Sequence, residues 1–286
     1  MANSIYFFID GGYVRTKFAD AMKRVFGVES NELDYGTVQG WCYGKRFGGV
    51  FGNAVPQRFF YYDCLRDIKK ATETDQEFTA RVQYQHESFK AIQSLLGFHV
   101  RLGSLSGTGK KLRQKKVDVL LAVEMLDNAF RKNMAGAVLL AGDADFIPVV
   151  EAVMRLGTWV EVCYDPHGAS EELYSLADKG TPLTFTDLWS WSSNEFRTKY
   201  YLPPRTEGSF NTLDFMPMNL REGKNARGER VMIAERGNKR GEFFVHVGDV
   251  PGISSWFTYP DVEVLEKYYV ECNGPINWDR EIRQKD

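Results

Sequence analysis

IYFFIDGG, residues 5–12, is an apolar run that ends in an aspartate followed by two glycines. A short run without polar interruption is typical of a strand buried on both faces, as in a parallel sheet. Asp10 would then lie at the C-terminal end of that strand, the edge at which α/β sheets bind ligands. Gly11 and Gly12 carry no side chain, so a backbone or a ligand can approach closely there.

A second run of the same kind, residues 137–141, is followed by Gly-Asp-Ala-Asp at 142–145. Asp143 is therefore predicted at the same edge of the sheet as Asp10. A third acid, Asp118, stands at the start of a predicted helix. Acids that gather at one edge repel one another unless a cation lies between them, and oxygen ligands suit magnesium or manganese. We therefore expect these three aspartates to share a Mg²⁺ or Mn²⁺ ion.

Each of these acids also has an ordinary structural explanation. Asp10 could cap the helix that follows it, and Asp118 could cap its own helix or interact with the helix dipole. Asp145 precedes an apolar first turn that contains a proline, so we expect it to act as a cap while Asp143 faces the site. Three independent caps at one sheet edge explain the pattern less well than one metal site.

Strand and helix signals alternate along the first two thirds of the sequence. Strands are predicted at 5–9, 58–62, 98–102, 137–141, 159–163 and 183–185, and helices at about 13–26, 74–96, 117–132, 146–156 and 170–178. Several of the helices end at a glycine, as at Gly97 and Gly157. The alternation predicts an α/β fold in which helices cover both faces of a mostly parallel sheet.

After about residue 188 the signals become hairpin-like, with apolar runs at 231–234 and 242–247 around Gly237 and Asn238. This predicts a small β-rich C-terminal appendage that closes with a short helix near 260–270. We divide the chain into a domain at 1–190, a linker at 191–208 and a small β-rich domain at 209–286. The basic residues between 221 and 240 are interleaved with glutamates, so a solvated hairpin and an RNA- or protein-binding surface are both open.

Composition sets further limits. The 286 residues are 43% hydrophobic, which suffices for one domain of about 150–200 residues and a smaller one. The formal net charge of −2 gives no overall attraction to nucleic acid, so such binding would need a local basic surface. The four cysteines form no C-x-x-C pair, so we expect reduced thiols and no zinc site. No apolar run approaches the ~20 residues of a membrane span, and we expect a soluble, cytoplasmic protein.

Three segments, FIDGGY at 8–13, KVDV at 116–119 and LAGDADF at 140–146, resemble in order and spacing the NYN family of PIN-like nucleases. The resemblance continues in YYD at 61–63 and SEEL at 170–173, and it covers about residues 4–188. It implies a PIN-like three-layer α/β/α sandwich and metal-dependent cleavage of RNA. PIN-like domains often pair, so the resemblance also allows for a homodimer.

By position, Asp10, Asp118 and Asp143 match the family's acids that hold magnesium or manganese, and Asp145 completes the cluster. The resemblance thus makes these four residues the metal-binding and catalytic set. Two positions depart from the family pattern. Tyr13 stands where many members have asparagine, and Ala144 stands where a small hydroxyl residue often lies between the paired acids. Loss of that hydroxyl could reduce activity, although the ligands remain.

A basic segment lies directly before Asp118. Its cations are Lys110, Lys111, Arg113, Lys115 and Lys116. Lysine and arginine contact phosphates regardless of sequence, so this segment predicts RNA binding that weakens with salt, although a solvated loop would have the same composition. Tyr13, Tyr61, Tyr62 and Trp159 are candidates for stacking on unpaired bases. Ser170 is expected to cap the helix after it, with a phosphate contact as a secondary role.

These observations favour a metal-dependent endoribonuclease that hydrolyses single-stranded or structured RNA with activated water. The alternative from another class is a catalytically weak RNA-binding or assembly module that keeps an acidic pocket. A phosphatase of the haloacid dehalogenase type is disfavoured, because Gly12 stands where such enzymes have a second acid. A toprim-like site is disfavoured because the acid of its first strand is typically glutamate.

Overall fold

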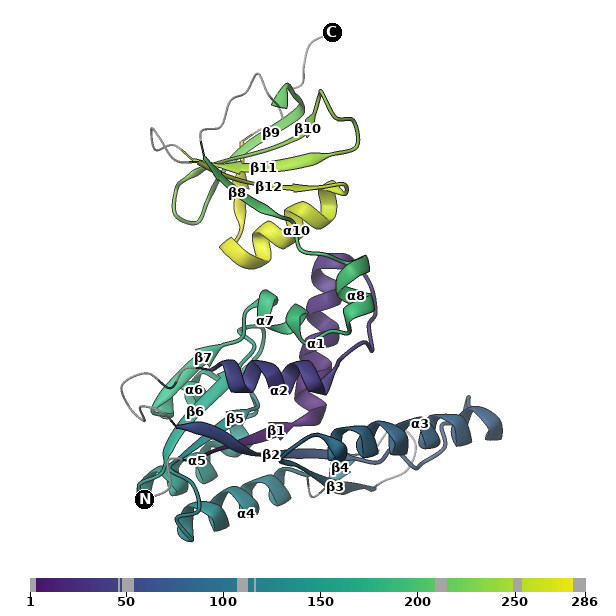
Figure 1. Ribbon diagram of the computed structural model, residues 1–286, viewed down its shortest axis with the longest axis vertical. Helices are drawn as coiled ribbons and strands as arrows, with labels where there is room; N and C mark the ends of the chain where they lie inside the picture. The colour runs from purple at the N-terminus through teal and green to yellow at the C-terminus, as the bar shows by residue number, and fades with distance from the viewer. Residues whose placement is uncertain are drawn as a thin grey trace. The chain divides into compact units, whose positions relative to one another are not determined.

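The computed structural model describes residues 4–45, 47, 54–106, 113–115, 117–208, 215–248 and 254–279. The chain forms two compact units, which are drawn together in Figure 1. The first unit comprises Met1–Phe18 and Leu33–Trp191, and the second comprises Ala19–Glu32 and Ser192–Asp286. Helix α1 (Gly11–Phe26) begins in the first unit and ends in the second.

The first unit is built on a sheet that has seven strands among the described residues, in the order β4-β3-β2-β1-β5-β6-β7. The strands are β1 (Ser4–Asp10), β2 (Val55–Cys64), β3 (Phe98–Ser106), β4 (Arg113–Lys115), β5 (Gly136–Leu140), β6 (Trp159–Tyr164) and β7 (Lys179–Pro182). All neighbours pair in parallel except β4, which runs antiparallel to β3. The strand order reverses between β1 and β5, so a topological switch point lies at their C-terminal ends.

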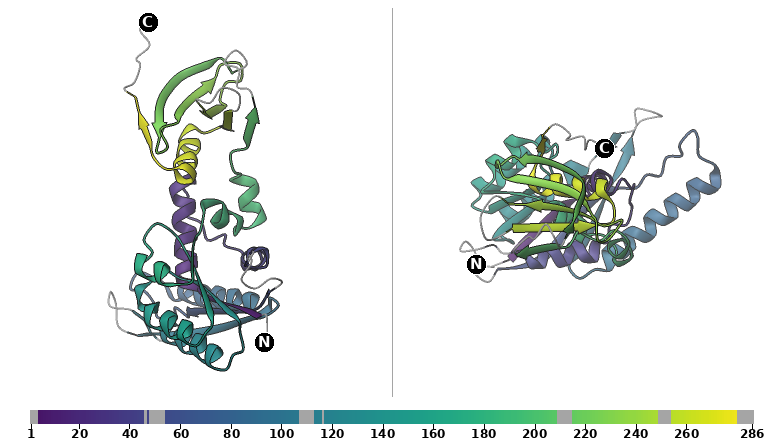
Figure 2. Two further views of the ribbon diagram at one scale, coloured as in Figure 1. Left: turned by 90° about the vertical axis from the view of Figure 1, so that its left-hand side faces the viewer. Right: turned by 90° about the horizontal axis from the view of Figure 1, so that it is seen from above.

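Helices cover both faces of this sheet, as Figure 2 shows. On one face, α4 (Val117–Phe130), α5 (Ile147–Arg155) and α6 (Glu171–Leu176) bury Leu121, Val150 and Leu173 against Phe8 and Leu139. On the other face, α2 (Tyr35–Gly44) and α3 (Asp75–Ser94) contact aromatic rings of β2. The three layers confirm the predicted α/β fold with a mostly parallel sheet.

Local signals explain where most elements begin and end. Thr74 and Glu77 form a capping box at the start of α3, which satisfies backbone amides of the first turn. Gly97 and Gly157 have φ values of +76° and +81°, and this left-handed conformation after a helix favours glycine. Both helix ends lie where the sequence predicted them.

One local prediction was wrong, and one helix was missed. The strand predicted at 183–185 lies earlier, at Lys179–Pro182, because Thr184 forms a capping box with Asp187 and starts helix α7 (Phe185–Ser190). Helix α2 was not predicted at all, because its sequence YGTVQGWCYG has two interior glycines and no helical repeat. Burial of Val38 and Cys42 holds it against the unit.

The second unit contains an antiparallel sheet of six strands among the described residues, in the order β13-β9-β10-β11-β12-β8. Its elements are α8 (Asn194–Lys199), β8 (Arg205–Gly208), β9 (Pro217–Asn225), β10 (Arg230–Arg236), β11 (Phe243–Val247), β12 (Ser254–Tyr259), α10 (Val262–Asn273) and β13 (Ile276–Trp278). Leu265, Tyr268 and Tyr269 of α10 are buried, and both tyrosines contact the ring of Phe257. The β-rich appendage, its β10–β11 hairpin and its closing helix are confirmed, while the expected linker holds α8 and β8.

Candidate active site

Asp10 is the last residue of β1, and it is half-buried at the switch point. Its Oδ1 accepts a hydrogen bond of 3.0 Å from the backbone amide of Tyr13, so it caps α1. The pKa of Asp10 is raised from 3.8 to about 6, mainly by burial and also by the charges of Asp118 and Asp63, against backbone hydrogen bonds that lower it. An ionised Asp10 is therefore held in an unfavourable electrostatic environment.

Asp118 lies in the first turn of α4 and is exposed. Its pKa is raised, first by partial burial and then by the negative charges of Asp143 and Asp145. Like charges perturb one another in this way only at short range. Carboxylates from β1, from α4 and from the segment after β5 thus lie in one electrostatic neighbourhood, while a metal ion shared by them stays a prediction.

The segment after β5 differs in detail from the expectation. Asp143, not Asp145, is the cap: its Oδ1 accepts a hydrogen bond of 3.0 Å from the amide of Asp145 and so caps the short 3₁₀ helix η3 (Ala144–Phe146). Helix α5 begins only at Ile147, and the residue before it makes no side-chain cap. The expectation failed because a 3₁₀ turn separates the strand from the helix.

Other acids at this edge are neutralised, which sets the candidate site apart. Asp63 is 1% exposed, and its Oδ1 lies 3.0 Å from Nη2 of Arg15. Asp165 is also 1% exposed, and its Oδ2 lies 3.7 Å from Nζ of Lys17. By contrast, no lysine or arginine of the described residues pairs with the four aspartates of the candidate site, Asp10, Asp118, Asp143 and Asp145.

In the described parts of the chain, no group of three His, Cys, Asp or Glu residues is arranged so that it could already hold a metal ion. The chemistry of the donors nevertheless fits a hard divalent cation, because all four side chains offer carboxylate oxygens. The charges of Asp118 and Asp63 contribute to the raised pKa of Asp10, and the same negative charges would favour a cation there. The four aspartates fit Mg²⁺ or Mn²⁺, and they would have to draw closer together to share one.

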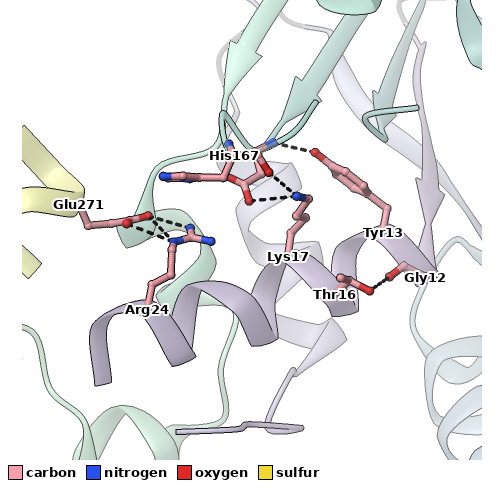
Figure 3. A network of polar contacts seen from close by, with 8 residues as sticks. Gly12, Tyr13, Thr16, Lys17, Arg24, His167 and Glu271 are labelled. Carbon is pink, nitrogen blue, oxygen red and sulfur yellow. Dashed lines mark hydrogen bonds and ion pairs between the residues drawn. The ribbon is translucent and has the colours of Figure 1, made fainter. Parts of the chain in front are cut away.

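Tyr13 holds the loops of the site together. Its amide binds Asp10, and its hydroxyl accepts a hydrogen bond of 2.8 Å from the amide of Asp165. A side chain on Gly142 would come within 2.7 Å of the Tyr13 ring, so this position admits only glycine without a shift. Figure 3 shows Tyr13 and Lys17 of α1 pointing to the loop that carries His167. Base stacking by Tyr13 stays a prediction.

The remaining predicted nucleic-acid contacts have different outcomes. Ser170 caps α6 through the amide of Leu173, as expected, and its own amide donates to the carbonyl of Gly142 at 2.9 Å. Lys110, Lys111 and Lys116 lie outside the described residues, and only the backbone of Arg113 and Lys115 is described, in β4. The basic segment therefore stays a prediction, although β4 places part of it beside β3.

Three of the proposed stacking residues are not available for that role. Tyr61 and Tyr62 are fully buried, and their hydroxyls donate to Asp63 and Glu124 respectively. Trp159 begins β6, so it lies at the opposite edge of the sheet from the acids. Alternation of polar and apolar residues could not show that these tyrosines are buried, because a central parallel strand is covered on both faces and has no such alternation.

Sequence reasoning missed the two pairs that neutralise Asp63 and Asp165. Asp63 ends the YYD motif of β2, and Asp165 follows β6 directly. Both positions carried the signal of an acid after an apolar strand. Their cations, Arg15 and Lys17, lie two residues apart on α1. This spacing does not indicate their partners, because the partners are known only once α1 has been placed across the ends of these strands.

The model of the NYN domain family matches residues 51–184. The chain contains an NYN domain. The matched range runs from before β2 to beyond β7, while β1 and Asp10 precede it. The NYN domain is PIN-like, and domains of this family are generally nuclease-like, which supports a hydrolase role.

A crystal structure of a protein of unknown function from Vibrio parahaemolyticus is similar to 63% of this chain and to 92% of its own, with 17% identity and a TM-score of 0.43. A likeness at that level carries no argument about function. No curated protein matches the sequence. Among the described residues, no helix has the length and apolar character needed to cross a membrane.

Proposed function

We propose that this protein is a metal-dependent endoribonuclease that hydrolyses RNA phosphodiester bonds at the acidic switch point of its NYN domain. The proposal is supported above all by Asp10, whose pKa of about 6 reflects burial and neighbouring acids. An uncompensated carboxylate at the ligand-binding edge of an α/β sheet is costly, and such sites are commonly functional. The nuclease-like character of the family supports the same proposal.

A divalent cation bound at this site would activate water and neutralise charge that develops on the phosphate. The chain's own residues would supply the rest. Asp10, Asp118, Asp143 and Asp145 would hold the cation, and the Asp118 carboxylate, which is more exposed than that of Asp10, is suited to orient the attacking water. The amide of Tyr13 fixes the orientation of the Asp10 side chain. No covalent enzyme nucleophile is required.

Arg15 and Lys17 have a separate role in this proposal. They pair with Asp63 and Asp165, and this reduces the negative charge that these buried acids add to a site that must admit a polyanion. The basic segment of residues 110–116 would contact phosphates on either side of the cleaved bond. Its contribution is independent of sequence and falls as salt is added.

A second function is favoured by a specific observation. The described acids form no ready metal-binding group, and both Asp10 and Asp143 already use one oxygen to cap a helix. A catalytically weak RNA-binding or assembly module could keep these acids for capping alone. In that case RNA would bind without cleavage, and the aspartates would be replaceable by asparagine, which caps equally well.

The two functions are separated by incubating purified protein with labelled single-stranded and hairpin RNA in Mn²⁺, in Mg²⁺ and in EDTA. Asp118→Asn and Asp143→Asn test the site. Asp75→Asn is the matched control, because Asp75 also lies in the first turn of a helix, α3, but is 94% exposed and pairs with Lys69. The nuclease proposal expects cleavage by wild type and by the control, and a loss of at least 100-fold in both site variants.

Thermal unfolding in the same metals gives a reading that does not depend on activity. Binding to the folded state raises Tm, so Mn²⁺ should stabilise wild type and the control but not Asp143→Asn. RNA binding without cleavage in any metal, together with a Tm that Mn²⁺ leaves unchanged, would select the binding module.

A further inference from the structure

Glu161 of β6 is a glutamate in the interior of the first unit. The residue is 0% exposed, and in the sheet it lies between Val138 of β5 and Lys179 of β7. Its Oε1 accepts hydrogen bonds of 2.6 Å from Nζ of Lys45 and from the hydroxyl of Thr181. Its Oε2 is buried and has no hydrogen-bond partner among the described residues. A buried oxygen without a partner is costly, so its presence needs an explanation.

The amine of Lys45 is fixed in place from several sides. Lys45 directly follows α2, and its side chain is only 9% exposed. Besides Glu161, its Nζ contacts Sγ of Cys163 at 3.3 Å and lies 4.8 Å from the centre of the Trp41 ring. A lysine normally keeps its charged end in water while its stem packs on the protein. Here the charged end is instead held against a thiol.

Cys163 completes the group. It lies two residues after Glu161 on β6, so both side chains are on the same face of the sheet. Cys163 is fully inaccessible, and its Sγ lies 3.7 Å from Oε1 of Glu161. Burial raises the pKa of the thiol to about 12, so the thiol stays protonated and is closed to large or charged oxidants. An amine, a thiol and a carboxylate are thus enclosed together in the described part of the first unit.

We propose that Lys45 and Cys163 form a modification site, at which dioxygen joins Nζ to Sγ through a single bridging oxygen atom. The fold already holds the two atoms in contact, so joining them needs no further loss of chain freedom. In this step one N–H bond and the S–H bond break, and an N–O and an O–S bond form. The amine and the thiol lose two electrons each, and dioxygen takes up all of them, leaving one oxygen in the bridge and the other in water.

Glu161 has the role of base in this step. Lys45 pairs with it as an ammonium group, which must lose a proton before its nitrogen can form a new bond. The carboxylate at 2.6 Å accepts that proton, and the oxygen without a partner no longer belongs to a buried charge once the carboxyl is neutral. Lys179 also contacts Glu161, but its side chain is 46% exposed, so water solvates its charge in the bridged state.

Dioxygen is the oxidant that suits the enclosure. It is small and uncharged, and small apolar molecules do enter protein interiors. The bridge would join residues 118 positions apart, and a cross-link of that span restricts the unfolded chain. We therefore expect the bridge to form slowly in air and to raise the unfolding temperature. The modification is independent of the proposed nuclease activity.

Intact mass spectrometry of the denatured protein tests the bridge. Protein purified in dithiothreitol is freed of it and then kept under air or under nitrogen. In air, wild type should gain about 14 Da, which is one oxygen gained and two hydrogens lost. Of the four cysteines of the chain, the bridged one should resist iodoacetamide after unfolding, whereas all should react in the nitrogen sample. Fresh dithiothreitol should reverse both changes, because an excess of this dithiol returns the electrons.

A peptide map and three variants assign the atoms. Digestion of the air sample should yield one cross-linked peptide that contains both Lys45 and Cys163, a result that needs no variant to fold. Cys163→Ser and Lys45→Arg should show no gain in mass, and Lys45→Arg keeps a cation beside Glu161 while it lacks a primary amine. Cys42→Ser is the matched control, because Cys42 is equally buried on α2, and it should gain mass as wild type does. Thermal unfolding should show a rise in Tm in air for wild type and Cys42→Ser alone.

A wild type whose mass does not change in air would overturn the proposal. A gain of about 32 Da confined to Cys163 would overturn it as well, and so would a loss of about 2 Da through a disulfide between Cys42 and Cys163, because neither product involves the amine. All of these readings are of mass, linkage and unfolding in the absence of RNA. Their outcome is therefore separate from RNA cleavage, which tests the four aspartates.

Discussion

Replacement of Asp10 by asparagine should make the metal-free protein more stable at neutral pH, although it removes a residue of the candidate site. Asparagine caps a helix as well as aspartate does, so the hydrogen bond from the Tyr13 amide is kept. The substitution removes only the negative charge, which burial and the neighbouring acids make unfavourable in the folded state. Most substitutions at an active-site acid would be expected to alter activity, but this one should also raise stability.

The size of the effect follows from the pKa of Asp10. Its value of about 6 in the folded protein lies above the ordinary 3.8, so between these two values the folded protein holds a proton that the unfolded chain has lost. The contribution of Asp10 to the free energy of unfolding is therefore most favourable below pH 4. This contribution is lost as the pH rises through 6. A shift of about two units corresponds to about 3 kcal/mol. Asp10→Asn should recover that amount at pH 8 and about half of it at pH 5.

Urea unfolding followed by circular dichroism measures this difference, in EDTA, at pH 5 and at pH 8. Asp20→Asn is the control, because Asp20 is an exposed aspartate of the same helix, and it should change the unfolding free energy by less than about 0.5 kcal/mol. Wild type should regain the lost stability when Mn²⁺ replaces EDTA. If Asp10→Asn is no more stable than wild type at pH 8, the acids do not crowd one another and the reasoning behind the metal site is refuted.

Four further substitutions test the fold by equilibrium unfolding. Arg15→Met should lower the unfolding free energy by about 3 kcal/mol, because it leaves the buried Asp63 carboxylate without its cation; an unchanged value would mean that water replaces the guanidinium. Gly11→Ala should cost about 1–3 kcal/mol, since its methyl group would overlap the ring of the fully buried Tyr61, whereas Gly40→Ala in α2, with open space around it, should gain about 0.5–1 kcal/mol. Lys132→Gly should gain about 1 kcal/mol, because Lys132 lies two residues after the end of α4 with a φ of +55°, and only glycine adopts that conformation freely. A loss would show that the lysine side chain has a contact of its own.

Strands β1, β2, β3, β5 and β6 could be predicted because each contains a short apolar run with a glycine or an acid at or near its end. Strands β4 and β7 have no such run. The placement of Asp10 and Asp143 at one sheet edge followed from that pattern alone, since parallel strands end at the same side. Asp118 was predicted near them because it lies at the start of a helix. Its distance from the other acids depends on how α4 crosses the sheet, and no pattern in the sequence indicates that crossing.

Other features could not be predicted, for physical reasons. Helix α2 forms because Val38 and Cys42 are buried by the rest of the unit, and its own propensity is low. The cap at Asp143 depends on a single 3₁₀ turn, which has no sequence signal of its own. The pairing of Arg15 with Asp63 joins residues that lie 48 positions apart. Such a contact exists only after α1 has been laid across the end of β2.

The position of β1 has a consequence for how the protein is made. This strand is translated before the other strands of its sheet, yet it lies at the centre of that sheet, between β2 and β5. Its second neighbour, β5, begins only at Gly136. The apolar residues of β1 therefore lack this partner while more than a hundred further residues are translated. During that interval β1 is the segment of the nascent chain most in need of shielding, and a pause in translation before β5 would prolong its exposure.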